Sequence, residues 1–231
     1  MNNVIIIAGH FGSGKTEFAI NYSRMLAKTL SKNVELVDLD FVNPYFRSRR
    51  FRDILAADGV TIVEPPDRAI SAADIPSVST SVLSMLSDKS RTFVLEVGGD
   101  AVGSRVLGQL NNQIIERGYT LYSIFNPNRP DTDSKEKIQK MVANIEISSK
   151  LKTEALISNC HLKEFTDEET LTDGLLFTQE LEKDYLPVKY FCVAEGMEIP
   201  ESVKNSSYEI VRLERFNTYC YEDGNHSEFS L

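Results

Sequence analysis

The sequence is organised around one glycine-rich stretch, Gly9-His10-Phe11-Gly12-Ser13-Gly14-Lys15-Thr16. It matches G-x-x-x-x-G-K-[ST], the pattern of a phosphate-binding loop, or P-loop. An apolar run at 4–8 precedes it and a helical pattern follows it, which is the strand, loop and helix context that the pattern requires. We therefore interpret residues 9–16 as a P-loop rather than as a chance glycine-rich turn.

The residue types of this loop suit an anionic phosphate chain. Glycines allow the backbone to form a concave nest whose N–H groups face the phosphate oxygens, and the following helix adds its positive N-terminal end. Lys15 is expected to reach the β- and γ-phosphates as a catalytic residue, and the Thr16 hydroxyl is expected to bind Mg²⁺. The predicted nucleotide contacts in this region are Gly9, His10, Gly12, Ser13, Gly14, Lys15, Thr16 and Glu17.

Strand-like and helix-like patterns alternate along the rest of the chain. This alternation predicts an α/β fold, with a doubly wound, mostly parallel sheet of seven to eight strands and helices on both faces. Residues 1–216 are expected to form one P-loop nucleotide-binding domain, and residues 217–231 a polar C-terminal tail. The predicted strands cover 4–8, 34–37, 60–63, 92–97, 119–125, 155–158, 188–193 and, less clearly, 208–213.

Capping patterns predict where three of the helices begin. Asn43 before Pro44 is typical of an N-cap followed by the first helical position. Asp133 with Glu136, and Thr166 with Glu169, have the spacing of capping boxes.

Composition narrows the classes of function. The chain has 231 residues and a formal net charge of −9, which argues against an extended nucleic-acid surface, because phosphate contacts need concentrated Lys and Arg. No apolar run is long enough to span a bilayer, and residues 221–228 are polar and acidic, so we expect no membrane anchor. Three widely spaced cysteines suggest neither a disulfide framework nor a cysteine metal site, and the expected location is the cytoplasm.

Polar residues follow several predicted strands where ligands of a doubly wound sheet bind, outside the strands' carboxyl ends. Asp38 and Asp40 follow the second strand, and Glu96 ends the apolar run Thr92-Phe93-Val94-Leu95. We interpret Glu96 as the Walker B acid that holds Mg²⁺ beside Thr16, directly or through water; the alternative is an exposed strand-end glutamate. Asn126, before Pro127, is interpreted chiefly as a turn former.

The P-loop, the Val37-Asp38-Leu39-Asp40 segment and the Glu96-Val97-Gly98-Gly99 segment together resemble the CobQ/CobB/MinD/ParA family of P-loop ATPases. The resemblance reaches to about Ala194. It implies that Asp40 positions the attacking water as a catalytic residue, that Asp38 and Asp40 support the Mg²⁺ shell, and that Asn159 and Ala194 contact the adenine. The sequence has no N-K-x-D, the guanine-reading pattern of many GTPases, so ATP is favoured over GTP as the nucleotide.

The chain departs from this family beside the first glycine of the loop. Members with a deviant Walker A motif carry there a signature lysine that reaches the partner's phosphates in an ATP-dependent dimer, and this chain has His10. Histidine is mostly neutral near pH 7, so a dimer of that kind is in doubt. One of Arg47, Arg49, Arg50 and Arg52 is a candidate substitute, and the alternative is a solvated basic helix face.

These observations lead to one favoured function and two alternatives. The favoured hypothesis is a Mg²⁺-dependent ATPase whose nucleotide state switches a conformation read by a protein partner, with an ATP-dependent homodimer left open. The first alternative is an ATP-dependent ligase, amidase or kinase acting on a small molecule, similar to dethiobiotin synthetase and cobyrinate amidation domains, with a substrate against the loop 65–76. The second alternative is a protein that binds nucleotide without turnover.

Overall fold

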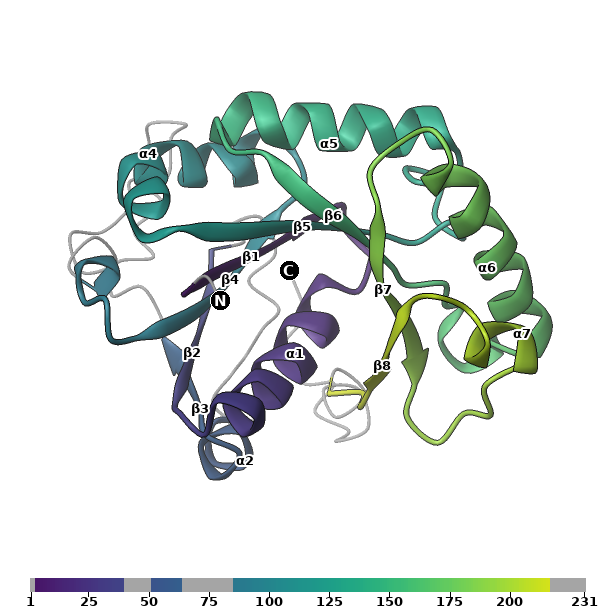
Figure 1. The fold of residues 1–231 in the computed structure, drawn as a ribbon, viewed down its shortest axis with the longest axis horizontal. Coiled ribbons are helices and arrows are strands. Elements are labelled where there is room, and N and C mark those ends of the chain that lie inside the picture. Colours follow the sequence, from purple (N-terminus) through teal and green to yellow (C-terminus); the bar gives the residue numbers. More distant parts are fainter. Residues whose placement is uncertain (1–2, 40–50, 64–84, 217–231) are drawn as a thin grey trace, which may run out of the picture.

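The computed structural model describes residues 3–39, 51–63 and 85–216, which form one parallel sheet with helices on both faces (Figure 1). The eight strands follow the order β3-β2-β4-β1-β5-β6-β7-β8, and every neighbouring pair is parallel. The predicted doubly wound α/β fold is therefore confirmed, at the upper end of the expected number of strands. The strands are β1 (Val4–Gly9), β2 (Val34–Asp38), β3 (Val60–Val63), β4 (Thr92–Gly98), β5 (Tyr119–Phe125), β6 (Thr153–Ser158), β7 (Val188–Ala194) and β8 (Glu209–Leu213).

Strand β1 lies near the middle of the sheet, between β4 and β5. All six of its residues are buried, as are all seven of β4, because strands covered on both faces have no side open to water. This explains why their sequences are continuous apolar runs rather than alternating ones. The order of the strands places the P-loop, which follows β1, next to the residues that end β4.

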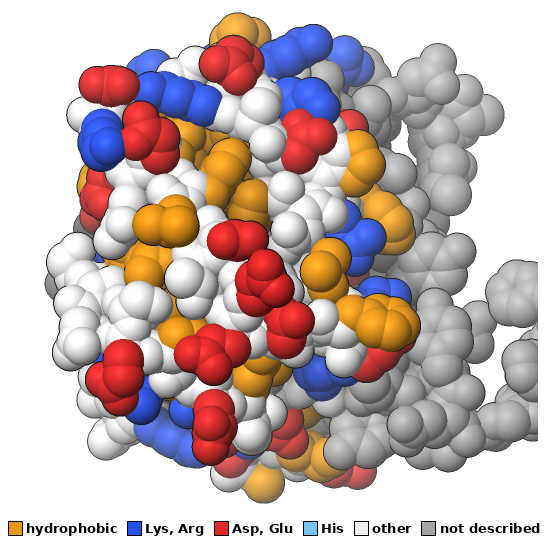
Figure 2. Space-filling view, turned by 90° about the vertical axis from the view of Figure 1, so that its right-hand side faces the viewer, with side chains coloured by type: hydrophobic (Ala, Val, Ile, Leu, Met, Phe, Trp, Pro, Cys, Tyr) orange, Lys and Arg blue, Asp and Glu red, His pale blue; other side chains and the backbone are white. Residues whose placement is uncertain are grey.

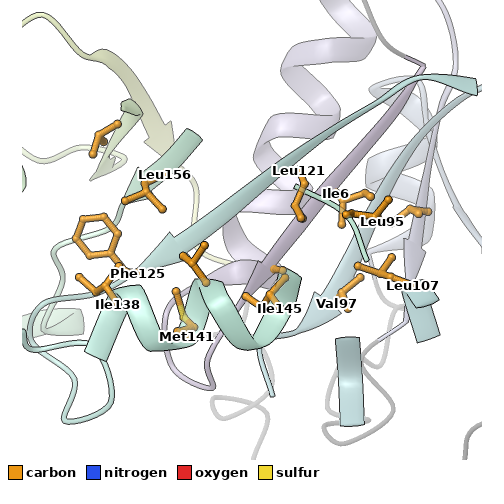
Figure 3. Close-up of a cluster of buried hydrophobic side chains, with 14 of the residues drawn as sticks. Ile6, Leu95, Val97, Leu107, Leu121, Phe125, Ile138, Met141, Ile145 and Leu156 are labelled. Carbon is orange, nitrogen blue, oxygen red and sulfur yellow. The ribbon is translucent and has the colours of Figure 1, made fainter. Parts of the chain in front are cut away.

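The helices divide between the two faces of the sheet. Helices α1 (Lys15–Leu30) and α2 (Arg52–Ala57) pack on one face, around a cluster that includes Phe18 and Leu55. The helices that cover the other face are α4 (Ala101–Arg117), α5 (Lys135–Ser149), α6 (Glu168–Glu182) and α7 (Glu201–Lys204). Figure 3 shows part of this second core, where side chains of α5 such as Met141 and Ile145 face strand residues such as Leu121.

Helix α5 begins one residue later than its predicted capping box. The N-cap is Ser134, whose hydroxyl accepts a hydrogen bond from the Lys137 N–H, and the Asp133 carboxylate instead pairs with the Lys137 ammonium at 2.7 Å. Two adjacent residues that can both cap a helix compete here, and sequence spacing alone does not choose between them.

Helix α6 shows the same shift. Its capping box is formed by Asp167 and Thr170, whereas the predicted cap, Thr166, donates its hydroxyl to the Lys163 carbonyl in the 3₁₀ turn Lys163–Phe165. The third predicted helix start, at Asn43, lies outside the described residues.

The last described residues run back along α1. Asn21 accepts a hydrogen bond from the Glu214 N–H at 3.1 Å and donates to the Glu214 carbonyl at 2.9 Å. Phe216 is 1% exposed, and its ring meets that of Phe51 edge-on at 5.4 Å. The segment 214–216 therefore belongs to the core on the α1 face. Within the described ranges, no helix combines the length and the apolar character that a membrane span requires.

Candidate functional site

The P-loop joins the buried strand β1 to helix α1, as the sequence pattern predicts. Gly12 and Gly14 have φ values of 78° and 89°, in the left-handed region that glycine adopts without strain. The Ser13 N–H donates to the His10 carbonyl at 3.2 Å, which closes the turn. The loop thus has the backbone shape of an anion-binding nest at the start of a sixteen-residue helix.

The segment after β4 lies directly against the start of this loop. The Gly99 N–H donates to the Gly9 carbonyl at 2.8 Å, and a Cβ added to Gly99 would lie 2.3 Å from the Gly9 carbonyl carbon. Such a separation is far below van der Waals contact with backbone that cannot swing away. Glycine at position 99 therefore allows two loops from neighbouring strands to touch.

Three of the predicted catalytic and metal-binding side chains meet at this edge of the sheet. The Thr16 hydroxyl donates to Glu96 Oε1 at 2.5 Å, which joins the first turn of α1 to the fifth residue of β4. Lys15 is 6% exposed, and its ammonium group is 3.4 Å from the His10 carbonyl within the loop. The structure thus brings Thr16, which follows Lys15 in the loop, into contact with the predicted Walker B carboxylate.

Asp38 lies in register with Glu96 across the pairing of β2 with β4 and is half-buried. A hydroxyl and carboxylates are the hard oxygen ligands that Mg²⁺ prefers, usually together with waters and nucleotide phosphates. In the described part of the chain, no group of three or more His, Cys, Asp and Glu side chains forms a metal cluster. Thr16, Glu96 and Asp38 carry oxygen atoms of this kind, and their role as Mg²⁺ ligands stays a prediction. Asp40 lies outside the described residues.

Asn159, which follows β6, is tied to the P-loop. Its side-chain amide donates to the Ser13 carbonyl at 2.7 Å, and the residue is 4% exposed. A Cβ on Gly14 would lie 2.0 Å from the Asn159 amide nitrogen, so this packing also requires glycine at position 14. The contact gives Asn159 a role in holding the loop, and its predicted role in reading adenine stays a prediction. The same holds for Ala194, which ends β7 and whose carbonyl lies 3.4 Å from Arg212.

Glu17 also makes a contact that holds the scaffold around the loop. One of its carboxylate oxygens accepts a hydrogen bond from the Phe216 N–H at 2.9 Å. This bond holds the C-terminal segment 214–216 against the start of α1. Glu17 thus supports the loop through its side chain, and its predicted contact with the nucleotide stays a prediction.

Positive charge gathers beside the loop although the whole chain is acidic. Burial, together with the nearby cations of Arg129, Arg215 and Lys163, lowers the pKa of His161 to about 4. The His161 backbone is fixed by Asn126, whose amide donates to the His161 carbonyl at 3.0 Å. Asn126 is fully buried, and its side chain accepts a hydrogen bond from the Asn128 N–H within the turn. This agrees with its interpretation as a turn former.

The lowered pKa of His161 predicts a measurable pH dependence of stability. In the unfolded chain the imidazole takes up a proton near its ordinary pKa of 6.5, whereas in the folded protein it stays neutral down to about 4. The unfolded state then binds more protons in this window, so the free energy of unfolding falls as the pH is lowered from 6.5 towards 4. Urea unfolding should show a weaker fall over this range for His161→Gln than for the wild type; parallel curves would contradict the prediction.

Sequence reasoning missed Arg129 as a neighbour of the P-loop. A Cβ added to Gly12 would lie 3.3 Å from Arg129 Nε, so the side chain passes close to this glycine. A usable signal was present, because Arg129 lies just before Pro130 in the loop after β5, and β5 pairs with β1. Of the four arginines that were predicted as lysine substitutes, Arg47, Arg49 and Arg50 lie outside the described residues, and Arg52 is exposed in the first turn of α2.

Comparison with known proteins supports the fold. No family model and no curated protein matches the sequence. Among solved structures, FlhF complexed with GTP and Mg²⁺ matches with a TM-score of 0.53 and 14% identity, over 87% of this chain and 68% of that one. FtsY from Mycoplasma mycoides matches with a TM-score of 0.54 and 15% identity, over 82% of this chain and 60% of that one.

A further FtsY, the signal recognition particle receptor from Elizabethkingia anophelis, matches with a TM-score of 0.50 and 14% identity, over 83% of this chain and 58% of that one. This chain thus spans about three fifths of the length of the FtsY structures that it resembles. The chain has the fold of the P-loop NTPases. These comparisons do not test whether the chain belongs to the CobQ/CobB/MinD/ParA family, and that resemblance stays a prediction.

Proposed function

We propose that this protein is a Mg²⁺-dependent ATPase whose nucleotide state controls a conformation that a protein partner recognises. The observation that carries the proposal is the contact of the Thr16 hydroxyl with Glu96 Oε1. Thr16 directly follows Lys15 in the loop. This contact supports a site in which a metal-binding hydroxyl, a Walker B carboxylate and the loop cation surround the phosphates of a nucleotide.

Each group has a distinct task in this scheme. The N–H groups of the loop and the Lys15 ammonium neutralise the phosphate oxygens, where negative charge builds up during transfer. Thr16 and Glu96 hold the Mg²⁺, with Asp38 beside them. Asp40 is proposed as the acceptor that orients the attacking water, because in-line attack needs such a group close to the γ-phosphate.

The bond between Gly99 and Gly9 supports a switch. It links the P-loop to the start of α4, because Asp100 follows directly and accepts a hydrogen bond from the Gly103 N–H at 2.6 Å, in the first turn of that helix. A shift of the loop on nucleotide binding would therefore also move the start of α4. Such coupling between a phosphate-contacting segment and a helix is a known way to convert nucleotide state into shape.

The partner is proposed to be a protein rather than a nucleic acid. Figure 2 shows acidic side chains across the face that carries α6, with basic ones mostly towards its margins, and Glu168, Glu169 and Asp173 are exposed there. A nucleic acid would be repelled by such a face. An ATP-dependent homodimer is one form that the protein partner can take.

The nucleotide is proposed to be ATP, since the sequence has no N-K-x-D, and GTP is the alternative because FlhF was solved with GTP and Mg²⁺. The loop 65–76, which would hold the substrate of a ligase or kinase, lies outside the described residues. No contact therefore favours that alternative.

Sizing of an Asp40→Ala variant tests the switch. We expect this variant to bind ATP and Mg²⁺, to release phosphate at least tenfold more slowly than the wild type, and to elute as a dimer or as a complex with its partner only when ATP is present. Wild-type protein with ADP is the control. Unchanged elution with ATP would contradict the switch, and phosphate release that needs a small metabolite would favour the ligase or kinase.

A further inference from the structure

The side chain of Arg129 occupies an unusual position for a surface-loop arginine. It comes from the loop after β5 and passes beside Gly12, at the turn of the P-loop. Within the described residues, its Nε atom is buried and has no hydrogen-bond partner. A buried donor of a charged group without an acceptor is costly, and native proteins usually pair such a group with an ion or a ligand.

The loop that carries Arg129 is held rigidly. The Arg129 N–H donates to the Asn126 carbonyl at 3.1 Å, and the Thr132 hydroxyl donates to the same carbonyl at 2.7 Å. The Asn126 side chain accepts a hydrogen bond from the Asn128 N–H, and Pro130 follows the arginine. The arginine therefore reaches the loop from a fixed base, so little conformational entropy is lost when it meets a ligand.

A polar atom of the P-loop also lacks a partner. Ser13 is 1% exposed, and its hydroxyl oxygen makes no hydrogen bond among the described residues. Arg129 Nε lies beside Gly12, whereas the Ser13 hydroxyl oxygen lies near Gly9, 3.0 Å from where a Cβ on that glycine would sit. An anion beside Gly12 would supply an acceptor to the arginine, because phosphate oxygens can accept several hydrogen bonds.

We propose that Arg129 is a phosphate-binding residue that contacts the phosphate chain of the nucleotide from the side of Gly12. The inference rests on the proposed function and adds a second fixed cation to it, supplied by the same chain. An arginine stays charged and offers a planar fork of donors that fits phosphate oxygens.

The test compares three variants by calorimetry with ATP and with adenosine. Arg129→Gln removes the charge and keeps most of the length; Arg129→Lys keeps the charge; and Arg215→Gln removes another cation that acts on His161. We expect Arg129→Gln to bind ATP about tenfold more weakly, with a shallower salt dependence and unchanged adenosine binding. Arg129→Lys should recover part of the affinity, and Arg215→Gln should stay within about threefold of the wild type.

Other outcomes are equally informative. Wild-type affinity for ATP in Arg129→Gln, while Lys15→Ala loses binding, would overturn the role of Arg129 and leave the proposed function standing. An equal loss of ATP and adenosine binding would overturn it in favour of contact with the base. If the wild type binds neither ATP nor GTP, the proposed function itself fails. Thermal unfolding of each variant separates these results from misfolding, and we expect Arg129→Gln to be as stable as the wild type.

Discussion

Replacing Lys15 by alanine is expected to reduce phosphate release by about a hundredfold or more. The ammonium group is held inside the loop, 3.4 Å from the His10 carbonyl, so it is already positioned for a nucleotide and needs no rearrangement. Charge that is fixed in a site shielded from water stabilises a transition state far more than the same charge in solution. Phosphate release with saturating ATP and Mg²⁺ measures the effect.

The chain offers a matched control for this experiment. Lys28 lies on the same helix, is exposed and belongs to its last turn. Lys28→Ala removes the same charge about twenty ångströms along the helix, given its rise of ~1.5 Å per residue, and should leave turnover unchanged. Turnover that survives in Lys15→Ala would contradict the proposed ATPase, because Lys15 is the cation that the proposal places at the β- and γ-phosphates.

The fold, and the approach of Thr16 to Glu96, could be predicted from the sequence because both follow from the pattern of strands. Strands buried on both faces appear as unbroken apolar runs, so β1 and β4 could be located within one or two residues. The contact between Thr16 and Glu96 could be anticipated because parallel strands carry their following loops to one edge of the sheet.

Contacts between distant loops could not be anticipated in this way. Asn159 donates to the Ser13 carbonyl across 146 residues of sequence, and Glu17 accepts from the Phe216 N–H across 199. No periodicity or spacing encodes such pairs, because they depend on how far each loop extends beyond its strand. The position of Arg129 belongs to the same class. The two misplaced helix caps differ in kind, since there the competing residues are adjacent and the difference in capping free energy is small.

Replacing Glu96 by glutamine is expected to lower turnover by about a hundredfold and to raise the Mg²⁺ concentration needed for half-maximal rate. Glutamine keeps the size of the side chain and an oxygen that accepts from the Thr16 hydroxyl, but it loses the charge that holds the metal. Glu96 is 4% exposed, so removing its charge should not lower the free energy of unfolding. Titration of phosphate release against Mg²⁺ measures both effects.

Two further variants make this result specific to the metal. Glu96→Asp keeps the charge but shortens the side chain by one methylene. Its turnover and its Mg²⁺ requirement should lie between those of the wild type and of Glu96→Gln if the carboxylate acts through a water molecule. Glu154→Gln removes a carboxylate from an exposed position of β6. It should change neither the turnover nor the Mg²⁺ concentration needed for half-maximal rate. An unchanged Mg²⁺ dependence in Glu96→Gln would remove Glu96 from the metal site. The contact between Thr16 and Glu96 would then only stabilise the packing of α1 against β4. Asp38, which is in register with Glu96, would become the candidate for the metal-binding acid.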